Sequence, residues 1–429
     1  MFSTLLSVTG LALALIPAAQ AGYNPSATNN IAVYWGQNSV GRVGSQNRLS
    51  YYCQNSPSIN IIPLSFLTGI SNPGMNLANA GDNCTAIAGS GLLSCPQIEA
   101  DIKECQSTYG KTIMLSIGGA TYSEGGFSSS SAAVAAANNV WAWFGPQQGG
   151  VRPFGSAVID GFDFDFESSV QNMEPFAQQL RTLIDAATDK KYYLSAAPQC
   201  PYPDQADQSF INGQVAMDWV QVQFYNNYCS VGNYPNGWNY ADWDNWAKNV
   251  SKNKNAKVLV GIPGAVTGAN SGSYASGSQL AQAISASKGY SSFGGIMMWD
   301  MSQLYANPGF EAEVVNDLGG GAPSQPNPPP LSPPRPSPLS PRPPDPLPQL
   351  AVQEPFPSGA NAVVRDTLVL PPASLPTSAS SAASGGLRAS KSNRHATTTT
   401  RQKKTLATIS LIGQVFYIWK RYIGDSVPL

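Results

Sequence analysis

The chain has 429 residues, of which only 11% are charged, and a formal net charge of -1. A chain of this length exceeds one typical domain, although an α/β barrel of about 250 residues or more folds as a single unit. The balanced charge excludes the strongly basic surface of a nucleic-acid-binding protein, so we expect no nucleic acid among its partners and favour a neutral polymer.

The first 21 residues have the features of an export signal. An apolar run over residues 11–16 precedes the small-residue sequence Ala19-Gln20-Ala21, which predicts a secretory signal peptide over residues 1–21 although a positively charged start is missing. A buried N-terminal helix is the alternative, because the run is too short to cross a bilayer. The signal predicts a secreted protein, extracellular or in the cell wall.

The chain contains six cysteines and no Cys-x-x-Cys motif, which predicts three disulfides in an oxidising compartment rather than a metal site. The cysteine positions alone leave the pairing open. We expect neither a metal nor a cofactor. Two Asn-x-Ser/Thr sequences, at Asn83 and Asn249, are candidate glycosylation sites and agree with export.

Apolar runs typical of β-strands recur through residues 22–320, with helical stretches such as residues 130–144 between several of them. Eight strands that alternate with helices predict a (β/α)8 TIM barrel as one domain over residues 22–320. A doubly wound sheet is the alternative, but the turn over residues 36–42 lacks the glycine spacing of a phosphate loop. The eight runs begin at Ile31, Ile59, Thr112, Ala157, Tyr192, Trp219, Lys257 and Gly294.

The composition changes after residue 320. Residues 321–405 are rich in proline and then in serine and threonine, which predicts a disordered linker or stalk. The short apolar segment 406–429 could be a lipid-anchor signal, a helix at a membrane interface or a disordered end. We favour the disordered end over attachment to a membrane or cell wall. The fold class is then an α/β barrel with a disordered Pro/Ser/Thr-rich C-terminal tail.

The single histidine, His395, falls in this tail. Its position excludes a Ser-His-Asp or Cys-His mechanism in the folded part and removes the commonest zinc ligand. Carboxylates, tyrosines and backbone groups remain as candidates for chemistry. They are most concentrated in the sequence DGFDFDFE, residues 160–167, where acids alternate with phenylalanines.

Alternate side chains of a β-strand share a face, so Asp163, Asp165 and Glu167 point to one side and the phenylalanines to the other. If the phenylalanines pack against outer helices, the acids line the barrel and rise towards its C-terminal mouth, where barrel enzymes do chemistry. Neighbouring carboxylates in a buried cleft retain protons, which makes Glu167, nearest the mouth, the natural proton donor. Asp160 has the opposite parity and is expected to be structural. An acidic edge strand or a calcium site is the alternative, but calcium loops use glycine and flexible oxygens.

Several motifs resemble one known family. DGFDFDFE resembles the DxxDxDxE signature of glycoside hydrolase family 18, and LSIGG, residues 115–119, resembles its SxGG strand. YWGQN from residue 34 and QFYNN from residue 223 are similar to the class III chitinases of plants and fungi, and MMWD precedes residue 301. The resemblance covers about residues 30–310 in the family's order and spacing, and it implies the (β/α)8 barrel.

The resemblance also implies a reaction. Members of this family hydrolyse β-1,4 linkages between N-acetylglucosamine units with retained configuration, using the acetamido oxygen of the substrate as nucleophile. Glu167 would protonate the glycosidic oxygen and later deprotonate water. Asp165 would hold the acetamido N–H, Asp163 would share a proton with Asp165, and Tyr225 would align the acetamido oxygen.

Further roles follow from the same resemblance. Four residues would contact sugar, with the last as the floor beneath the reacting unit: Tyr34, Gln37, Gln223 and Trp299. Ordinary core packing is the alternative for Tyr34 and Trp299. Ser116, Gly118 and Gly119 would allow close packing beside the acidic strand. The disulfides would join Cys53 to Cys105, Cys84 to Cys95 and Cys200 to Cys229.

The sequence therefore predicts a monomeric, secreted endo-chitinase that acts on chitin or chitooligosaccharide. Two alternatives keep the barrel. One is a non-catalytic chitin-binding lectin or inhibitor, which is disfavoured because Glu167, Asp165 and Tyr225 are all present. The other is an endo-β-N-acetylglucosaminidase that acts on N-glycans, which is disfavoured by the YWGQN and QFYNN motifs.

Overall fold

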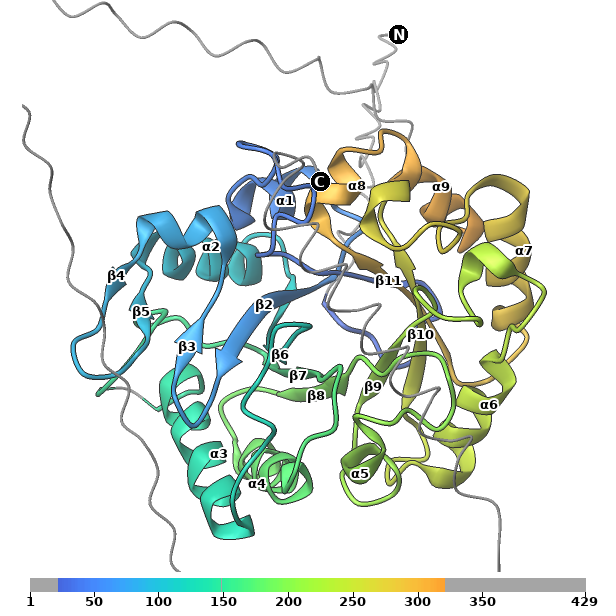
Figure 1. Ribbon diagram of the computed structural model, residues 1–429. Helices are drawn as coiled ribbons and strands as arrows, with labels where there is room; N and C mark the ends of the chain where they lie inside the picture. The colour runs from blue at the N-terminus through green and yellow to red at the C-terminus, as the bar shows by residue number, and fades with distance from the viewer. Residues whose placement is uncertain (1–21, 148, 321–429) are drawn as a thin grey trace, which may run out of the picture. The chain divides into compact units, whose positions relative to one another are not determined.

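The computed structural model describes residues 22–147 and 149–320 (Figure 1). The predicted signal peptide, the linker, the C-terminal segment and His395 lie outside the described residues. Those assignments stay predictions.

Eight parallel strands close into a barrel, in the order β1, β11, β10, β9, β8, β7, β6, β2. Ala32 of β1 pairs with Ile61 of β2 and completes the ring. Each predicted apolar run overlaps one strand, so the predicted TIM barrel is confirmed and the doubly wound sheet is wrong. The strands are β1 (Asn30–Val33), β2 (Ile61–Gly69), β6 (Thr112–Gly118), β7 (Gly161–Asp165), β8 (Tyr193–Ala196), β9 (Trp219–Gln223), β10 (Lys257–Pro263) and β11 (Phe293–Trp299).

Helices surround the strands (Figure 1). In α4 the buried residues Phe176, Leu180 and Ile184 recur every four positions, so one stripe of the helix faces the barrel. The helices are α1 (Leu49–Asn55), α2 (Pro96–Ser107), α3 (Ser130–Phe144), α4 (Met173–Ala186), α5 (Gln208–Ile211), α6 (Tyr240–Asn245), α7 (Gly277–Lys288), α8 (Met301–Tyr305) and α9 (Phe310–Asp317). Short elements in the loops are β3 (Gly74–Met75), η1 (Ala78–Asn83), β4 (Thr85–Ala86), β5 (Leu93–Ser94), η2 (Val231–Asn233), η3 (Trp246–Val250) and η4 (Val266–Gly268).

Two apolar clusters fill the molecule, one between strands and helices and one inside the barrel. The phenylalanines of β7 belong to the outer cluster, where the ring of Phe164 lies 6.1 Å from that of Phe176 in α4 and 5.2 Å from that of Phe210 in α5. The period of two therefore sends the acids of β7 inward, as the sequence predicts. Asp160, just before β7, pairs with Lys190 at 2.7 Å and accepts from the Ile113 amide at 2.8 Å, which is the expected structural role.

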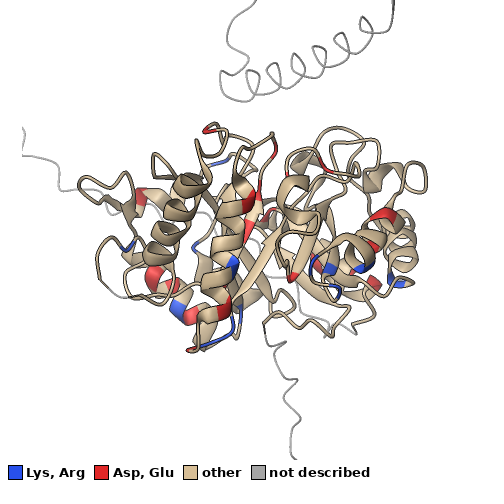
Figure 2. Ribbon diagram, turned by 90° about the horizontal axis from the view of Figure 1, so that it is seen from below, with Lys and Arg blue, Asp and Glu red and all other residues tan. Residues whose placement is uncertain are grey.

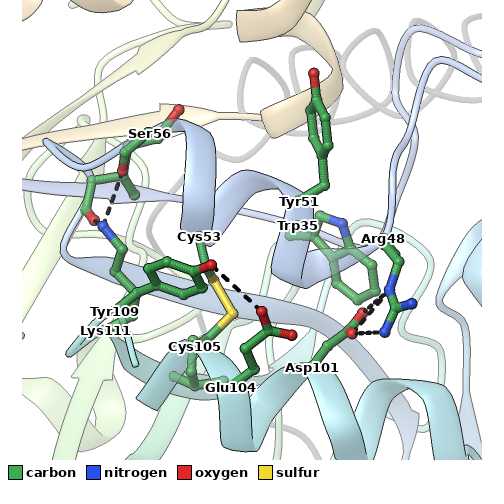
Figure 3. Close-up of a disulfide and its surroundings, with 12 residues drawn as sticks. Trp35, Arg48, Tyr51, Cys53, Ser56, Asp101, Glu104, Cys105, Tyr109 and Lys111 are labelled. Atoms are coloured by element: carbon green, nitrogen blue, oxygen red, sulfur yellow. Dashed lines mark hydrogen bonds and ion pairs between the residues drawn. A yellow bond between two sulfur atoms is a disulfide. The ribbon is translucent and has the colours of Figure 1, made fainter. Parts of the chain in front are cut away.

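The disulfides join the cysteines as the resemblance implies: Cys53 to Cys105, Cys84 to Cys95 and Cys200 to Cys229. The first links α1 to α2, beside the ion pair of Arg48 with Asp101 (Figure 3). Near it, the buried Lys111 donates to the backbone carbonyl of Ser56 at 3.0 Å. Burial lowers the pKa of Lys111 to about 8, with a smaller opposing effect of Glu311.

Charged residues are sparse and scattered along the ribbon, most of which is neither red nor blue (Figure 2). This distribution agrees with the predicted preference for a neutral partner. Among residues 22–147 and 149–320, no helix combines the length and the apolar character needed to cross a membrane.

Candidate active site

The row of acids begins inside the barrel and ends at the carboxyl end of β7. Asp163 and Asp165 are buried at 0% and 3% exposure, whereas Glu167, two residues further on, is partly exposed. Gly118 of β6 lies beside this row, and a Cβ there would come within 2.5 Å of the Asp165 carbonyl oxygen. Gly118 has a φ of +114°, so both conformation and space require glycine. The close packing expected of Gly118 is present.

Four donors hold the carboxylate of Asp163. The hydroxyls of Tyr34 and Ser116 each donate to Oδ2 at 2.7 Å, while the Ser195 hydroxyl at 2.7 Å and the Gln221 amide at 3.0 Å donate to Oδ1. Burial raises the pKa of Asp163, and these hydrogen bonds oppose the rise because they favour the charged form. The donors occupy both oxygens, so the sharing of a proton with the next acid stays a prediction.

Asp165 has a different environment. The Gln223 amide donates to its Oδ1 at 2.8 Å and also to the Ala197 carbonyl at 2.9 Å. Burial, followed by the charges of Glu167 and Asp163, holds the pKa of Asp165 well above its usual range. The surroundings of Asp165 therefore favour its neutral form, whereas the four donors around Asp163 favour the charged form of that residue.

Glu167 meets the requirements of a general acid at neutral pH. Burial and then the charge of Asp204 raise its pKa to about 7. Asp204 lies in the loop after β8, where its carboxylate accepts backbone N–H groups of Gln199 at 3.0 Å, Ala206 at 2.8 Å and Asp207 at 2.7 Å. These bonds fix the negative charge that acts on Glu167.

Tyr225 follows β9 directly and belongs to the cluster inside the barrel, with 6% exposure. Burial, then the charges of Asp165 and Glu167, keeps the pKa of Tyr225 well above its usual range. The phenol is therefore neutral and keeps the proton it needs to donate a hydrogen bond.

The residues predicted to contact sugar differ in their exposure. Tyr34 is only 1% exposed and its hydroxyl binds Asp163, so the core-packing alternative describes its place better than the cleft. Trp299 is partly exposed, and its ring lies 5.9 Å from Phe66 and 5.4 Å from Tyr34. Trp299 thus offers an aromatic surface at the end of β11.

The side-chain amides of Gln37 and Gln223, which were expected to contact sugar, instead bind groups of the protein itself. The Gln37 amide donates to the carbonyls of Ser65 and Asn76, both at 2.9 Å, and so joins the loop after β1 to the β2 hairpin. The Gln223 amide holds Asp165. Ser116, expected only to allow close packing, instead donates to Asp163. These side chains position the acids and the loops around them.

The sequence prediction missed Ser195, Gln221, Asp204 and Asp207. Gln221 has the parity of Gln223 on β9, a signal that could have placed it inside the barrel. Ser195 and Asp204 carry no comparable signal. Asp207 is fully buried, and neither of its carboxyl oxygens has a hydrogen-bond partner among the described residues. Burial and the charges of Asp204, Asp165, Asp163 and Glu167 hold the pKa of Asp207 well above its usual range.

The family described as glycosyl hydrolases family 18 matches residues 30–292. The chain belongs to this family. The family 18 chain is 56% identical over 324 residues to Endochitinase 33 of Trichoderma harzianum, a match that covers 73% of this chain and 99% of the relative. It is 47% identical over 320 residues to a class III chitinase of Arthroderma benhamiae, covering 71% and 90%. The predicted family is confirmed.

Solved structures share the family 18 barrel. A chitinase from Ipomoea carnea, ICChI, is 29% identical with a TM-score of 0.54, over 67% of this chain and 99% of that one. A xylanase and amylase inhibitor protein, XAIP-III, is also 29% identical, with a TM-score of 0.55 over 67% and 98%. The same barrel is therefore found in proteins named for catalysis and for inhibition, so the fold by itself does not decide between the two.

Proposed function

We propose that this chain is a secreted endochitinase that hydrolyses β-1,4 linkages between N-acetylglucosamine units with retained configuration. One observation supports it above the others: Glu167, with a pKa of about 7, ends a row of buried acids at the mouth of the barrel. A carboxyl group with that pKa is half protonated at neutral pH and both donates and accepts a proton. The 56% identity to Endochitinase 33 supports the same substrate class.

The proposed reaction begins when Glu167 protonates the glycosidic oxygen while the acetamido oxygen of the substrate attacks the anomeric carbon from the opposite face. The bond from that carbon to the glycosidic oxygen breaks, and the departing sugar leaves with a hydroxyl group. Asp165 accepts the acetamido N–H and, once its proton is shared with Asp163, stabilises the positive charge of the cyclic intermediate. Tyr225 donates its hydroxyl to the acetamido oxygen and aligns it. Glu167, now ionised, removes a proton from a water molecule that attacks the anomeric carbon and breaks its bond to the acetamido oxygen. The two displacements at this carbon together retain configuration.

Asp163 acts on this reaction through its neighbours. Its four hydrogen bonds favour its charged form against the effect of burial, and a negative charge at Asp163 raises the pKa of Asp165. Gln223 fixes the orientation of Asp165 at 2.8 Å. We assign Tyr34, Ser116, Ser195, Gln221 and Gln223 to positioning, and Trp299 to contact with the sugar ring through its partly exposed face.

The test compares Glu167→Gln with the wild type on chitin oligomers and on an N-glycosylated protein in parallel. The variant should lose about 10²- to 10⁴-fold in kcat, because the general acid and base are removed. Glu174→Gln, an exposed position in the first turn of α4, is the matched control and should keep full activity. Wild-type kcat in Glu167→Gln would contradict the assignment.

The wild-type protein distinguishes the alternatives. Binding of chitin oligomers without turnover would favour a lectin or inhibitor, for which the similarity to XAIP-III gives the precedent of the fold. Release of glycans from the glycoprotein without cleavage of chitin oligomers would favour an endo-β-N-acetylglucosaminidase. Cleavage of internal linkages in the oligomers supports the endochitinase.

A further inference from the structure

Two adjoining hollows, of about 580 and 470 Å³, lie among the loops that follow β9 and β10. Tyr228 and Asn233 line both of them. Every lining residue is Tyr, Asn, Gln, Ser or Gly, so the surface offers amides, hydroxyls and aromatic rings without a formal charge. The mechanism above uses none of these side chains.

Tyr228 is the most exposed aromatic side chain among the described residues, at 62%. It is nevertheless supported from below by Gly237, where a Cβ would lie 2.6 Å from the Tyr228 carbonyl oxygen and 3.1 Å from its ring carbon Cδ2. Gly237 has a φ of +71°, a conformation that glycine adopts at little cost. The ring of Tyr228 is therefore exposed to solvent and packs against Gly237, a position that a larger residue could not occupy without a shift of the backbone.

The walls of the hollows are held by covalent and polar links. Cys229, next to Tyr228, is bonded to Cys200. The Gln279 amide donates to the carbonyls of Gly232 at 2.9 Å and Tyr234 at 3.1 Å, which ties the loop after β9 to α7. A surface ordered in this way binds a ligand without first paying the entropy of ordering.

The loop after β9 also connects this surface to the acids. Tyr225, two residues after the end of β9, precedes Tyr228 by three residues. The Asn227 side-chain amide donates to the side-chain oxygen of Gln199, and the Gln199 backbone N–H donates to Asp204. The loop after β9 therefore carries both Tyr225 and residues that line the hollows, so this loop adjoins a polymer whose reacting unit is bound at Tyr225. The apolar face of a pyranose ring matches an exposed tyrosine, and its hydroxyl and acetamido groups match asparagine amides.

We propose that Tyr228 and Asn233 form an additional sugar-binding site for N-acetylglucosamine units of the chain that is cleaved at Glu167. The site rests on the proposed function for the identity of the sugar. It makes cleavage depend on substrate length, because only an oligomer long enough to reach Tyr228 gains from the contact. Binding energy from such remote units lowers the barrier at the reacting bond.

The test measures kcat/KM on chitohexaose and on a short chromogenic chitobioside. Tyr228→Ala should lower the ratio of kcat/KM on chitohexaose to kcat/KM on the chitobioside by about 3- to 10-fold, the size of effect expected for one aromatic contact. Tyr228→Phe keeps the ring and should keep the wild-type ratio. Asn233→Ala, which also removes the amide that donates to the Tyr228 carbonyl at 3.1 Å, should lower the ratio in the same direction.

Tyr290→Ala is the matched control, since Tyr290 is the other exposed tyrosine within residues 22–147 and 149–320, at 36%, and lies between α7 and β11 at the opposite end of the barrel. An unchanged ratio in Tyr228→Ala, or an equal loss in Tyr290→Ala, would overturn the site while leaving the endochitinase in place. If the wild type cleaves no chitin oligomer, calorimetric binding of chitohexaose decides. A 3- to 10-fold weaker affinity of Tyr228→Ala then supports the site, and equal affinity or no binding overturns it.

Discussion

Replacing Tyr34 with phenylalanine removes one hydroxyl from the environment of Asp163 and changes little else in shape. The hydroxyl donates to Asp163 Oδ2 at 2.7 Å and accepts from the Gln221 amide at 2.6 Å. Gln221 keeps its bond to Asp163 Oδ1, and Ser116 and Ser195 keep theirs. The variant therefore leaves the buried carboxylate with three donors in place of four.

The expected cost follows from the charge of the acceptor. A hydrogen bond to a charged group contributes about 1.5–3 kcal/mol, and Tyr34 and Asp163 are both inaccessible to water that could replace it. We expect the free energy of unfolding of Tyr34→Phe to fall by about 2 kcal/mol. The pKa of Asp163 rises because its charged form loses a donor.

The loss of this hydrogen bond should also lower kcat. A higher pKa at Asp163 weakens the negative charge that favours a proton on Asp165, so the pair is less often in the proposed reactive state. Each 1.4 kcal/mol costs tenfold in rate, so we expect kcat on chitin oligomers to fall by about 10-fold or more. Urea unfolding measures the stability, and oligomer hydrolysis at saturating substrate measures kcat.

Tyr52→Phe is the matched control, because Tyr52 is equally buried and its hydroxyl accepts from the backbone N–H of Asn47 at 2.9 Å, away from Asp163 and Asp165. This variant should lose stability and keep the wild-type kcat. A Tyr34→Phe protein with wild-type stability and wild-type kcat would refute the role of the fourth donor. Equal losses of kcat in both variants would refute the specific link to Asp163.

Two further predictions concern protons. The kcat/KM should fall as pH rises through about 7, because Glu167 must be protonated to donate a proton. In Asp204→Asn this fall in kcat/KM should begin at lower pH, because the negative charge that raises the pKa of Glu167 is gone. An unchanged pH profile in a folded Asp204→Asn protein would contradict the influence of Asp204. Asp207 has a raised pKa in the folded protein, so its stability contribution is present below the unfolded pKa of about 3.9 and is lost as pH rises towards the folded pKa. The stability of Asp207→Asn relative to wild type should therefore grow by about 1.4 kcal/mol for each pH unit above about 4, until the folded pKa is reached. A difference that does not depend on pH in urea unfolding would show that Asp207 is ionised in the folded state.

The side of a strand to which each side chain points could be predicted, whereas the position of that side chain along the barrel axis could not. Alternation in residues 160–167 placed Asp163, Asp165 and Glu167 on one face because the strand period is two. The same rule cannot tell whether Tyr34 lies in the cleft or beneath it, since depth depends on how far neighbouring strands are shifted along the barrel. The structure places Tyr34 beside Asp163, at 1% exposure.

The sequence by itself determined the barrel and the inward row of acids, because these depend on periodicity and motif order within short segments. Only the tertiary structure decided which donors meet Asp163, which charge raises the pKa of Glu167, and that the Gln37 and Gln223 amides have partners inside the protein. Ser116, Ser195 and Gln221 come from three different strands, β6, β8 and β9. Contacts between residues so distant in the chain arise from the parallel register and closure of the barrel, which no local pattern encodes.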